Sequence, residues 1–205
     1  MSVDLATDLA VKSLESFGAG IRASIRGLWK GVITEEEFVD GMYVTLLRGY
    51  TQAWNEGAEA CGISPEDFTD EEGAELNQLF EADLAFAPRL AAEIAEVDKA
   101  AEGKLGPWLS RAELWTNGYN RVRSKAQQLA CADQKLEWVW DPFAEHCSSC
   151  EALNGRVHRA SVWESFNIQP QSRFLACGGW NCKCEFRITT KPATRGRPPI
   201  LARGL

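Results

Sequence analysis

Apolar residues recur every three or four positions through the first half of the chain, which is the pattern of amphipathic α-helices. The first such stretch covers residues 3–29. Gly18 and Gly20 would kink or interrupt this helix. Basic residues line one of its faces at four-residue steps: Arg22, Arg26 and Lys30. A phosphate-contacting stripe would have this form, but a solvated helix face explains it more simply.

A second helix is predicted to begin at Thr34, because Glu37 stands three positions later and the two residues form a capping-box pattern. Apolar residues then follow at steps of four: Phe38, Met42, Leu46, Tyr50 and Trp54. We expect Gly57 and Gly62 to end this helical region.

The next stretch has one apolar face and is otherwise strongly acidic. Ser64 and Pro65 predict a helix start, since proline suits the first helical position. Pro88 is expected to break the helix near residue 87. Twelve acidic residues lie between 66 and 102, against Arg89 and Lys99. Such a surface is usually solvated, although in an assembly protein it could contact a basic partner or repel DNA.

Residues 103–106 form a candidate linker before a further helix, predicted from Ser110 to about Cys131. Arg111 and Glu113 stand near its start. No nucleophile accompanies them, so we expect them to hydrogen-bond the helix to a sheet and not to act in catalysis.

Strand patterns appear only after this helix. Residues 136–140 and 156–158 are expected to pair like a hairpin, residues 161–166 to form a helical turn, and residues 184–190 to form a closing strand. The predicted fold class is α+β. A mostly helical region (1–105) precedes a small α+β domain with a zinc knuckle (106–190) and a basic flexible tail (191–205) with four basic and no acidic residues.

Five of the seven cysteines lie close together in the second half of the chain. Cys147 and Cys150 form a C-x-x-C pair, and a second cluster follows: Cys177, Cys182 and Cys184. Paired cysteines separated by a loop are typical of a small β-rich element that holds a tetrahedral zinc ion through thiolates. A regular strand over 182–186 would point Cys182 and Cys184 to the same face. Four thiolates close a structural site, so one cysteine is spare, and the spacing leaves open which of the second cluster it is.

Other roles for these residues must be weighed. The N-terminus has no apolar signal segment, which favours a reducing compartment where thiols bind metal more often than they form disulfides. His146 and His158 are reserve ligands. A catalytic zinc would need an open position and a base such as Glu145 or Glu151. Isolated cysteines behave as small buried apolar residues, and we expect this of two: Cys61 and Cys131.

The cysteine frame resembles that of the phage head morphogenesis family of minor head proteins. That family carries C-x-x-C-x-x-L-x-G-x-V and, after a spacer, H-P-x-C-x-C. Here C-S-S-C-E-A-L-N-G-R-V at 147–157 matches the first block and N-C-K-C at 181–184 the last. S-R-A-E-L-W-T-N-G-Y-N-R at 110–121 is similar to the family's upstream helix, so the resemblance covers about residues 108–188. Cys177-Gly178-Gly179 stands where the family has His-Pro, so a cysteine could replace a histidine ligand.

The resemblance implies a structural, non-enzymatic virion protein. Such a protein would bind the portal and the major capsid protein during head assembly, first in the host cytoplasm and then in the virion head, and its basic tail could touch DNA. Two alternatives remain: a zinc-dependent nuclease or hydrolase, and a zinc-ribbon nucleic-acid-binding module. The net charge of −7 argues against general nucleic-acid binding. No apolar run reaches the 18 or more residues of a membrane span, so no membrane partner is expected.

Overall fold

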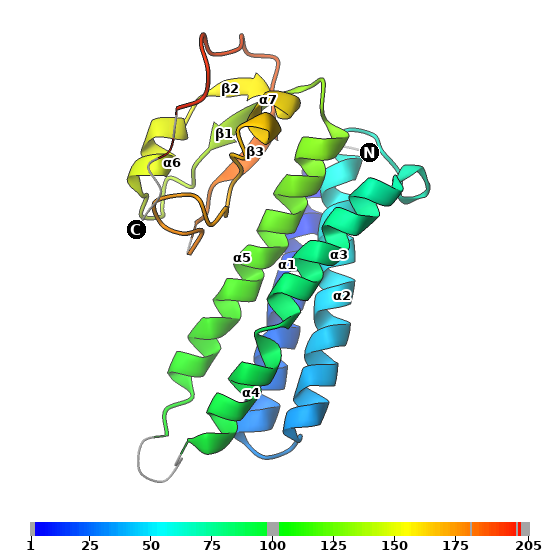
Figure 1. The fold of residues 1–205 in the computed structure, drawn as a ribbon, viewed down its shortest axis with the longest axis vertical. Helices are drawn as coiled ribbons and strands as arrows, with labels where there is room; N and C mark the ends of the chain where they lie inside the picture. Colours follow the sequence, from blue (N-terminus) through cyan, green and yellow to red (C-terminus); the bar gives the residue numbers. More distant parts are fainter. Residues whose placement is uncertain (1–2, 98–102, 181, 200, 202–205) are drawn as a thin grey trace. The chain divides into compact units, whose positions relative to one another are not determined.

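Helices dominate the first two thirds of the chain, and a small sheet follows (Figure 1). This computed structural model describes residues 3–97, 103–180, 182–199 and 201. The elements are α1 (Val3–Trp29), α2 (Glu35–Glu59), a 3-10 turn η1 (Pro65–Asp67), α3 (Asp70–Leu84), α4 (Ala87–Glu96), α5 (Gly106–Ala130), β1 (Lys135–Val139), α6 (Ser148–Leu153), β2 (Val157–Arg159), α7 (Ala160–Ser165) and β3 (Glu185–Ile188). The predicted α+β class, with a helical N-terminal part, is confirmed.

The chain divides into two compact units. Unit 1 comprises residues 1–52 and 73–119, and unit 2 comprises residues 53–72 and 120–205. This division differs from the boundary expected at 105/106, because α2 and α5 each contribute residues to both units.

Unit 1 is a set of helices whose apolar faces pack together. The Phe17 ring of α1 packs, tilted, against Tyr50 of α2 and Tyr119 of α5, with ring centroids 6.0 Å and 5.3 Å apart. The Tyr50 hydroxyl donates to the Asp83 carboxylate of α3, and the Trp115 indole donates to the Asp83 carbonyl at 3.3 Å. Aromatic burial with satisfied polar tips therefore holds the four helices together.

Several helices begin or end at residues other than those predicted from the sequence. α1 continues through both Gly18 and Gly20. The capping box at Thr34 is confirmed, since Thr34 Oγ1 accepts the Glu37 N–H at 3.1 Å and Glu37 Oε2 accepts the Thr34 N–H at 2.7 Å. Ser64-Pro65 begins only η1, and a second capping box, Thr69 with Glu72, precedes α3. The predicted break near residue 87 is present between α3 and α4.

α5 begins at Gly106, four positions before the predicted start, so Ser110 lies inside the helix. The role predicted for Arg111 and Glu113 is wrong. Arg111 pairs with Glu93 of α4, and Glu113 pairs with Arg22 of α1 at 3.2 Å, so both bind other helices of unit 1. The residues 98–102 that precede the candidate linker lie outside the described part.

Gly57 does not end α2, which continues to Glu59. A Cβ at position 57 would lie 2.3 Å from the Arg123 carbonyl oxygen and 2.8 Å from the Ala126 Cβ. Glycine is therefore required because α2 and α5 approach closely there. Gly62, with φ +77°, follows the end of the helix as predicted.

Unit 2 contains a three-stranded antiparallel sheet in the order β2-β1-β3. The predicted pairing of the first two strands is confirmed, with Leu136 opposite His158. Trp138 of β1 packs edge-to-face on Phe186 of β3 and lies near Trp163 of α7. The Trp163 indole donates to the Leu136 carbonyl at 3.0 Å, so α7 is fastened to the sheet that it covers.

The first part of the predicted flexible tail bonds to the sheet. Thr194 and Val157 exchange two hydrogen bonds, one of 2.8 Å from the Thr194 N–H and one of 2.9 Å to its hydroxyl. Lys191 pairs with Glu137 at 2.6 Å. The described tail therefore follows the free edge of β2 at this point.

Candidate metal centre

One short helix positions the first cysteine pair. Cys147 is the extended residue before α6, and Cys150 lies in its first turn, so one turn brings the two sulfurs to 3.5 Å. The Ser149 hydroxyl of α6 accepts the Ala176 N–H at 2.9 Å. This bond ties α6 to the segment that carries Cys177.

Two glycines turn the chain directly after Cys177. Gly178 and Gly179 have φ of +61° and +79°, which glycine adopts at little cost. A Cβ at Gly179 would lie 2.4 Å from the Gln171 carbonyl oxygen. The loop therefore packs too closely there for any other residue.

Cys182 and Cys184 precede the last strand. The sheet ladder begins at Glu185, where Val139 is its partner. The predicted strand over 184–190 thus begins one residue later and ends at Ile188, and the cysteine pair lies outside the ladder. Both side chains are buried, at 4% and 2% exposure.

The five cysteines converge in two groups that share Cys150. One group is Cys147, Cys150 and Cys177, and the other is Cys150, Cys182 and Cys184; within each group all sulfurs lie within 4.8 Å of one another. The second group is fully buried, whereas Cys147 and Cys177 are partly exposed. Cys177 thus lies with the C-x-x-C pair, although Cys182 and Cys184 are nearer to it in sequence.

This arrangement is able to hold a metal ion. Tetrahedral zinc with bonds of about 2.3 Å to thiolates places neighbouring sulfurs about 3.8 Å apart. The Cys147–Cys150 and Cys150–Cys182 sulfurs are 3.5 Å and 3.9 Å apart. In a [4Fe–4S] cluster each cysteine binds a different iron at the outside of an inorganic core, which keeps the sulfurs further apart. The spacing therefore fits a single small ion.

The crowding of the thiols strongly affects their protonation. Hydrogen bonds from Cys150, Cys177 and Cys184 lower the pKa of Cys182 well below its usual range. A bond from Cys150 lowers the pKa of Cys177, but the Cys182 thiol and burial outweigh it and raise that pKa to about 11. Neighbouring thiolates repel one another, so one ionises at the expense of the rest. A divalent cation at their centre would remove this repulsion.

A buried indole is a further donor beside the site. Trp138 is fully buried, and within the described part of the chain its Nε1 has no oxygen or nitrogen partner. The Cys150 thiol, and to a smaller extent the Trp138 N–H, lower the pKa of Cys184, but the Cys182 thiol and burial outweigh them and raise that pKa to about 12. A thiolate at Cys184 would therefore satisfy an otherwise unpaired indole N–H.

A hollow of about 370 Å³ opens over the cysteines. All five cysteines line it, together with Glu145, His146, Trp180 and Lys183. His146 stacks on Trp140 with ring centroids 4.3 Å apart, and its Nε2 lies 2.8 Å from the Asp141 carbonyl oxygen.

The two histidines considered as alternative metal ligands, His146 and His158, differ in their position relative to the hollow. His158 lies on β2, buried edge-to-face against Trp163 at 4.9 Å, and does not line the hollow. Glu151 also lies outside it. Among the described residues, the groups able to hold a metal consist of cysteines alone.

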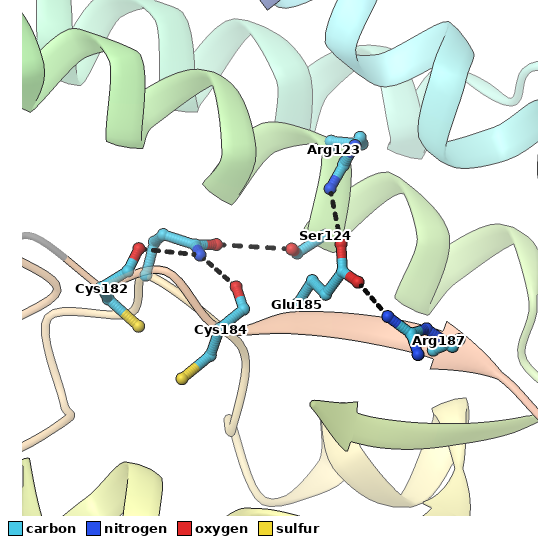
Figure 2. Close-up of polar contacts among 7 residues, drawn as sticks. Arg123, Ser124, Cys182, Cys184, Glu185 and Arg187 are labelled. Atoms are coloured by element: carbon cyan, nitrogen blue, oxygen red, sulfur yellow. Dashed lines mark hydrogen bonds and ion pairs between the residues drawn. The ribbon is translucent and has the colours of Figure 1, made fainter. Parts of the chain in front are cut away.

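An ion-pair chain joins the strand after the cysteines to α5 (Figure 2). Glu185 lies between Arg123 of α5, at 3.5 Å, and Arg187 of β3, at 2.9 Å. Gln128 of α5 donates to the Ile168 carbonyl at 2.7 Å, so the loop before Cys177 also bonds to this helix. Both contacts lie within unit 2.

Sequence reasoning missed two features of this unit. Cys61 and Cys131, expected to be separate apolar residues, form a disulfide, so that expectation was wrong. Their separation of 70 positions carries no signal of pairing. The second is Gln171, whose positive φ of 58° and buried amide had no sequence signature.

Comparisons with known proteins give no relatives: no family model matches the chain, and no curated protein or solved structure matches it significantly. Among the described residues, no helix has the length and apolar character needed to span a membrane.

Proposed function

We propose that the cysteine centre holds one structural zinc ion and that the chain is a minor head protein of a tailed bacteriophage. The main support for a zinc site is the convergence of five sulfurs at spacings suited to a tetrahedral ion. Cys150, Cys182 and Cys184 supply three ligands, and Cys147 or Cys177 supplies the fourth. The ion stabilises a unit whose three strands are only three to five residues long.

The virion role rests on the resemblance to the phage head morphogenesis family. Its support is that the two sequence blocks carrying the resemblance, 147–157 and the C-x-C at 182–184, meet at one site. The protein binds the portal and the major capsid protein during assembly in the host cytoplasm and stays in the head. Exposed Arg195 and Arg197 are the described tail residues best suited to contact DNA.

Two measurements test this proposal separately. Metal analysis of protein purified under reducing conditions should return about one zinc per chain, and a metal-free preparation would refute the metal centre. Quantitative mass spectrometry of mature and DNA-free heads should find a few copies per particle with the portal. Absence from both kinds of head would remove the structural virion role.

A zinc-dependent nuclease or hydrolase is the second candidate. The hollow favours it, because Glu145 and His146 line the same opening as the five cysteines, where a base would stand beside a metal. Hydrolysis of DNA or of ester substrates by the zinc-loaded protein, lost in Glu145→Gln with zinc retained, would support this candidate. If the wild-type protein hydrolyses none of these substrates, the enzyme candidate is rejected and the structural role of the zinc is retained.

A further inference from the structure

Gln171 lies between α5 and the C-x-C segment. Its amide nitrogen donates to the carbonyl oxygens of both Cys182, at 3.2 Å, and Cys184, at 2.5 Å. Its amide oxygen accepts from the Ser124 hydroxyl of α5 at 3.5 Å. Figure 2 shows the sulfurs of Cys182 and Cys184 on the same side, both pointing away from the carbonyl oxygens of these residues.

Two hydrogen bonds from one amide group, to carbonyls two residues apart, restrain the backbone of the C-x-C segment. In extended backbone, the carbonyls of residues i and i+2 point the same way, and so do their side chains. One NH₂ group that binds both carbonyls therefore holds both sulfurs toward one point. The ladder of β3 begins only at Glu185, so the sheet does not supply this constraint at Cys182.

The backbone of Gln171 is itself in an unfavourable conformation. Its φ of 58° lies in the left-handed region that residues with a Cβ adopt at a cost. The side chain is 4% exposed, and Gly179 packs against the Gln171 carbonyl. A strained residue with a buried, fully used amide indicates that the surroundings hold it in place for its hydrogen bonds.

We propose that Gln171 is a positioning residue of the metal centre: through the carbonyls of Cys182 and Cys184 it orients both thiolates before the ion binds. This inference rests on the proposed zinc site. Partners outside the ligand set typically change metal affinity by about 10–100-fold. Loss of the two Gln171 donors should therefore accelerate zinc release.

The test uses the full zinc-loaded chain and a coloured chelator in excess that reports zinc release. Gln171→Glu keeps the shape and loses the NH₂ group, and Gln171→Met keeps the approximate volume without adding a charge. Gln128→Glu is the matched control, because Gln128 is a buried amide that donates to the Ile168 carbonyl and to no ligand. We expect release to be about 10-fold or more faster in both Gln171 variants and unchanged in the control.

A spectrum separates positioning from general destabilisation. Cobalt(II) in place of zinc should show an altered thiolate charge-transfer spectrum in the Gln171 variants and a wild-type spectrum in Gln128→Glu. Equal release rates and equal spectra in wild type and Gln171 variants would overturn the inference while the zinc site stands. Failure of the wild type to bind either metal would instead remove the zinc site on which the inference rests.

If neither Gln171 variant folds, Ser124→Ala decides the question. It removes only the bond to the Gln171 amide oxygen, so the amide becomes less firmly held. Faster zinc release from this variant supports the positioning role, and an unchanged rate contradicts it.

Discussion

Cys61 and Cys131 are joined by a disulfide although 70 positions separate them. Cys61 follows the end of α2, and Cys131 follows the end of α5. Cys131 belongs to the apolar core that also contains Cys150, Cys182 and Cys184, and Cys61 packs against this core. The bond thus links the two helix ends within unit 2, and the other five cysteines remain unpaired.

Removal of this disulfide should weaken the fold. A cross-link closing a loop of this length stabilises by about 4 kcal/mol, mainly by restricting the unfolded chain. The double variant Cys61→Ser/Cys131→Ser should therefore unfold at a clearly lower denaturant concentration under non-reducing conditions. Reductant should shift the wild-type midpoint and leave that of the variant unchanged. Coinciding midpoints for the two proteins without reductant would contradict the role of the bond.

The close approach at Gly57 gives a second prediction. Gly57→Ala places a methyl group against the Arg123 carbonyl oxygen and should destabilise by about 1–3 kcal/mol, the range for overpacking. Gly73→Ala in α3 is the matched control. A Cβ there meets nothing within 4 Å, so alanine should be neutral or stabilise by up to about 1 kcal/mol. Thermal melts of both variants test this, and equal effects would contradict the contact.

Because Cys150 belongs to both cysteine groups, substitutions of the individual cysteines should reduce zinc binding to different extents. Cys150→Ser should abolish zinc binding and lower the melting temperature, because Cys150 belongs to both groups. Cys147→Ser and Cys177→Ser should each keep about one zinc per chain, because either cysteine can complete the tetrahedron. The double variant Cys147→Ser/Cys177→Ser should bind zinc weakly. Metal analysis after dialysis measures all four proteins, and loss of zinc from one single variant only would identify the fixed fourth ligand.

The buried histidine predicts a pH dependence of stability. Burial, with a smaller contribution from the Arg156 charge, lowers the pKa of His158 below its ordinary value of 6.5. The unfolded state therefore binds a proton more readily than the folded state, and the free energy of unfolding should fall as the pH decreases below about 6.5. The contribution is fully present above that pH.

His158→Phe should flatten this part of the stability curve, because it removes the titrating group and keeps a ring against Trp163. His146→Gln provides the comparison at the partly exposed histidine. Denaturant unfolding between pH 5 and 8 gives the slopes for all three proteins. An equal slope for wild type and His158→Phe would assign the dependence to other groups.

The sequence correctly predicted those features that depend only on residues close together in the chain. The capping box at Thr34 and Glu37 lies within four residues, so its pattern is readable directly. The C-x-x-C pair likewise depends on one turn of α6. The prediction that Gly57 ends α2 failed because the role of this glycine depends on Arg123, which is remote in sequence. In the sequence alone, a glycine that ends a helix cannot be distinguished from one that allows two helices to pack closely.

The sequence by itself determined the α+β class, the early helices, the pairing of β1 with β2 and the set of cysteines able to bind a metal, because periodicity, capping and ligand spacing act over short stretches. Tertiary structure alone decided that Cys61 meets Cys131, that Cys177 joins the first cysteine pair, and that the Gln171 amide reaches the C-x-C carbonyls. These contacts depend on how distant segments pack around one core, and no short stretch of sequence encodes that packing.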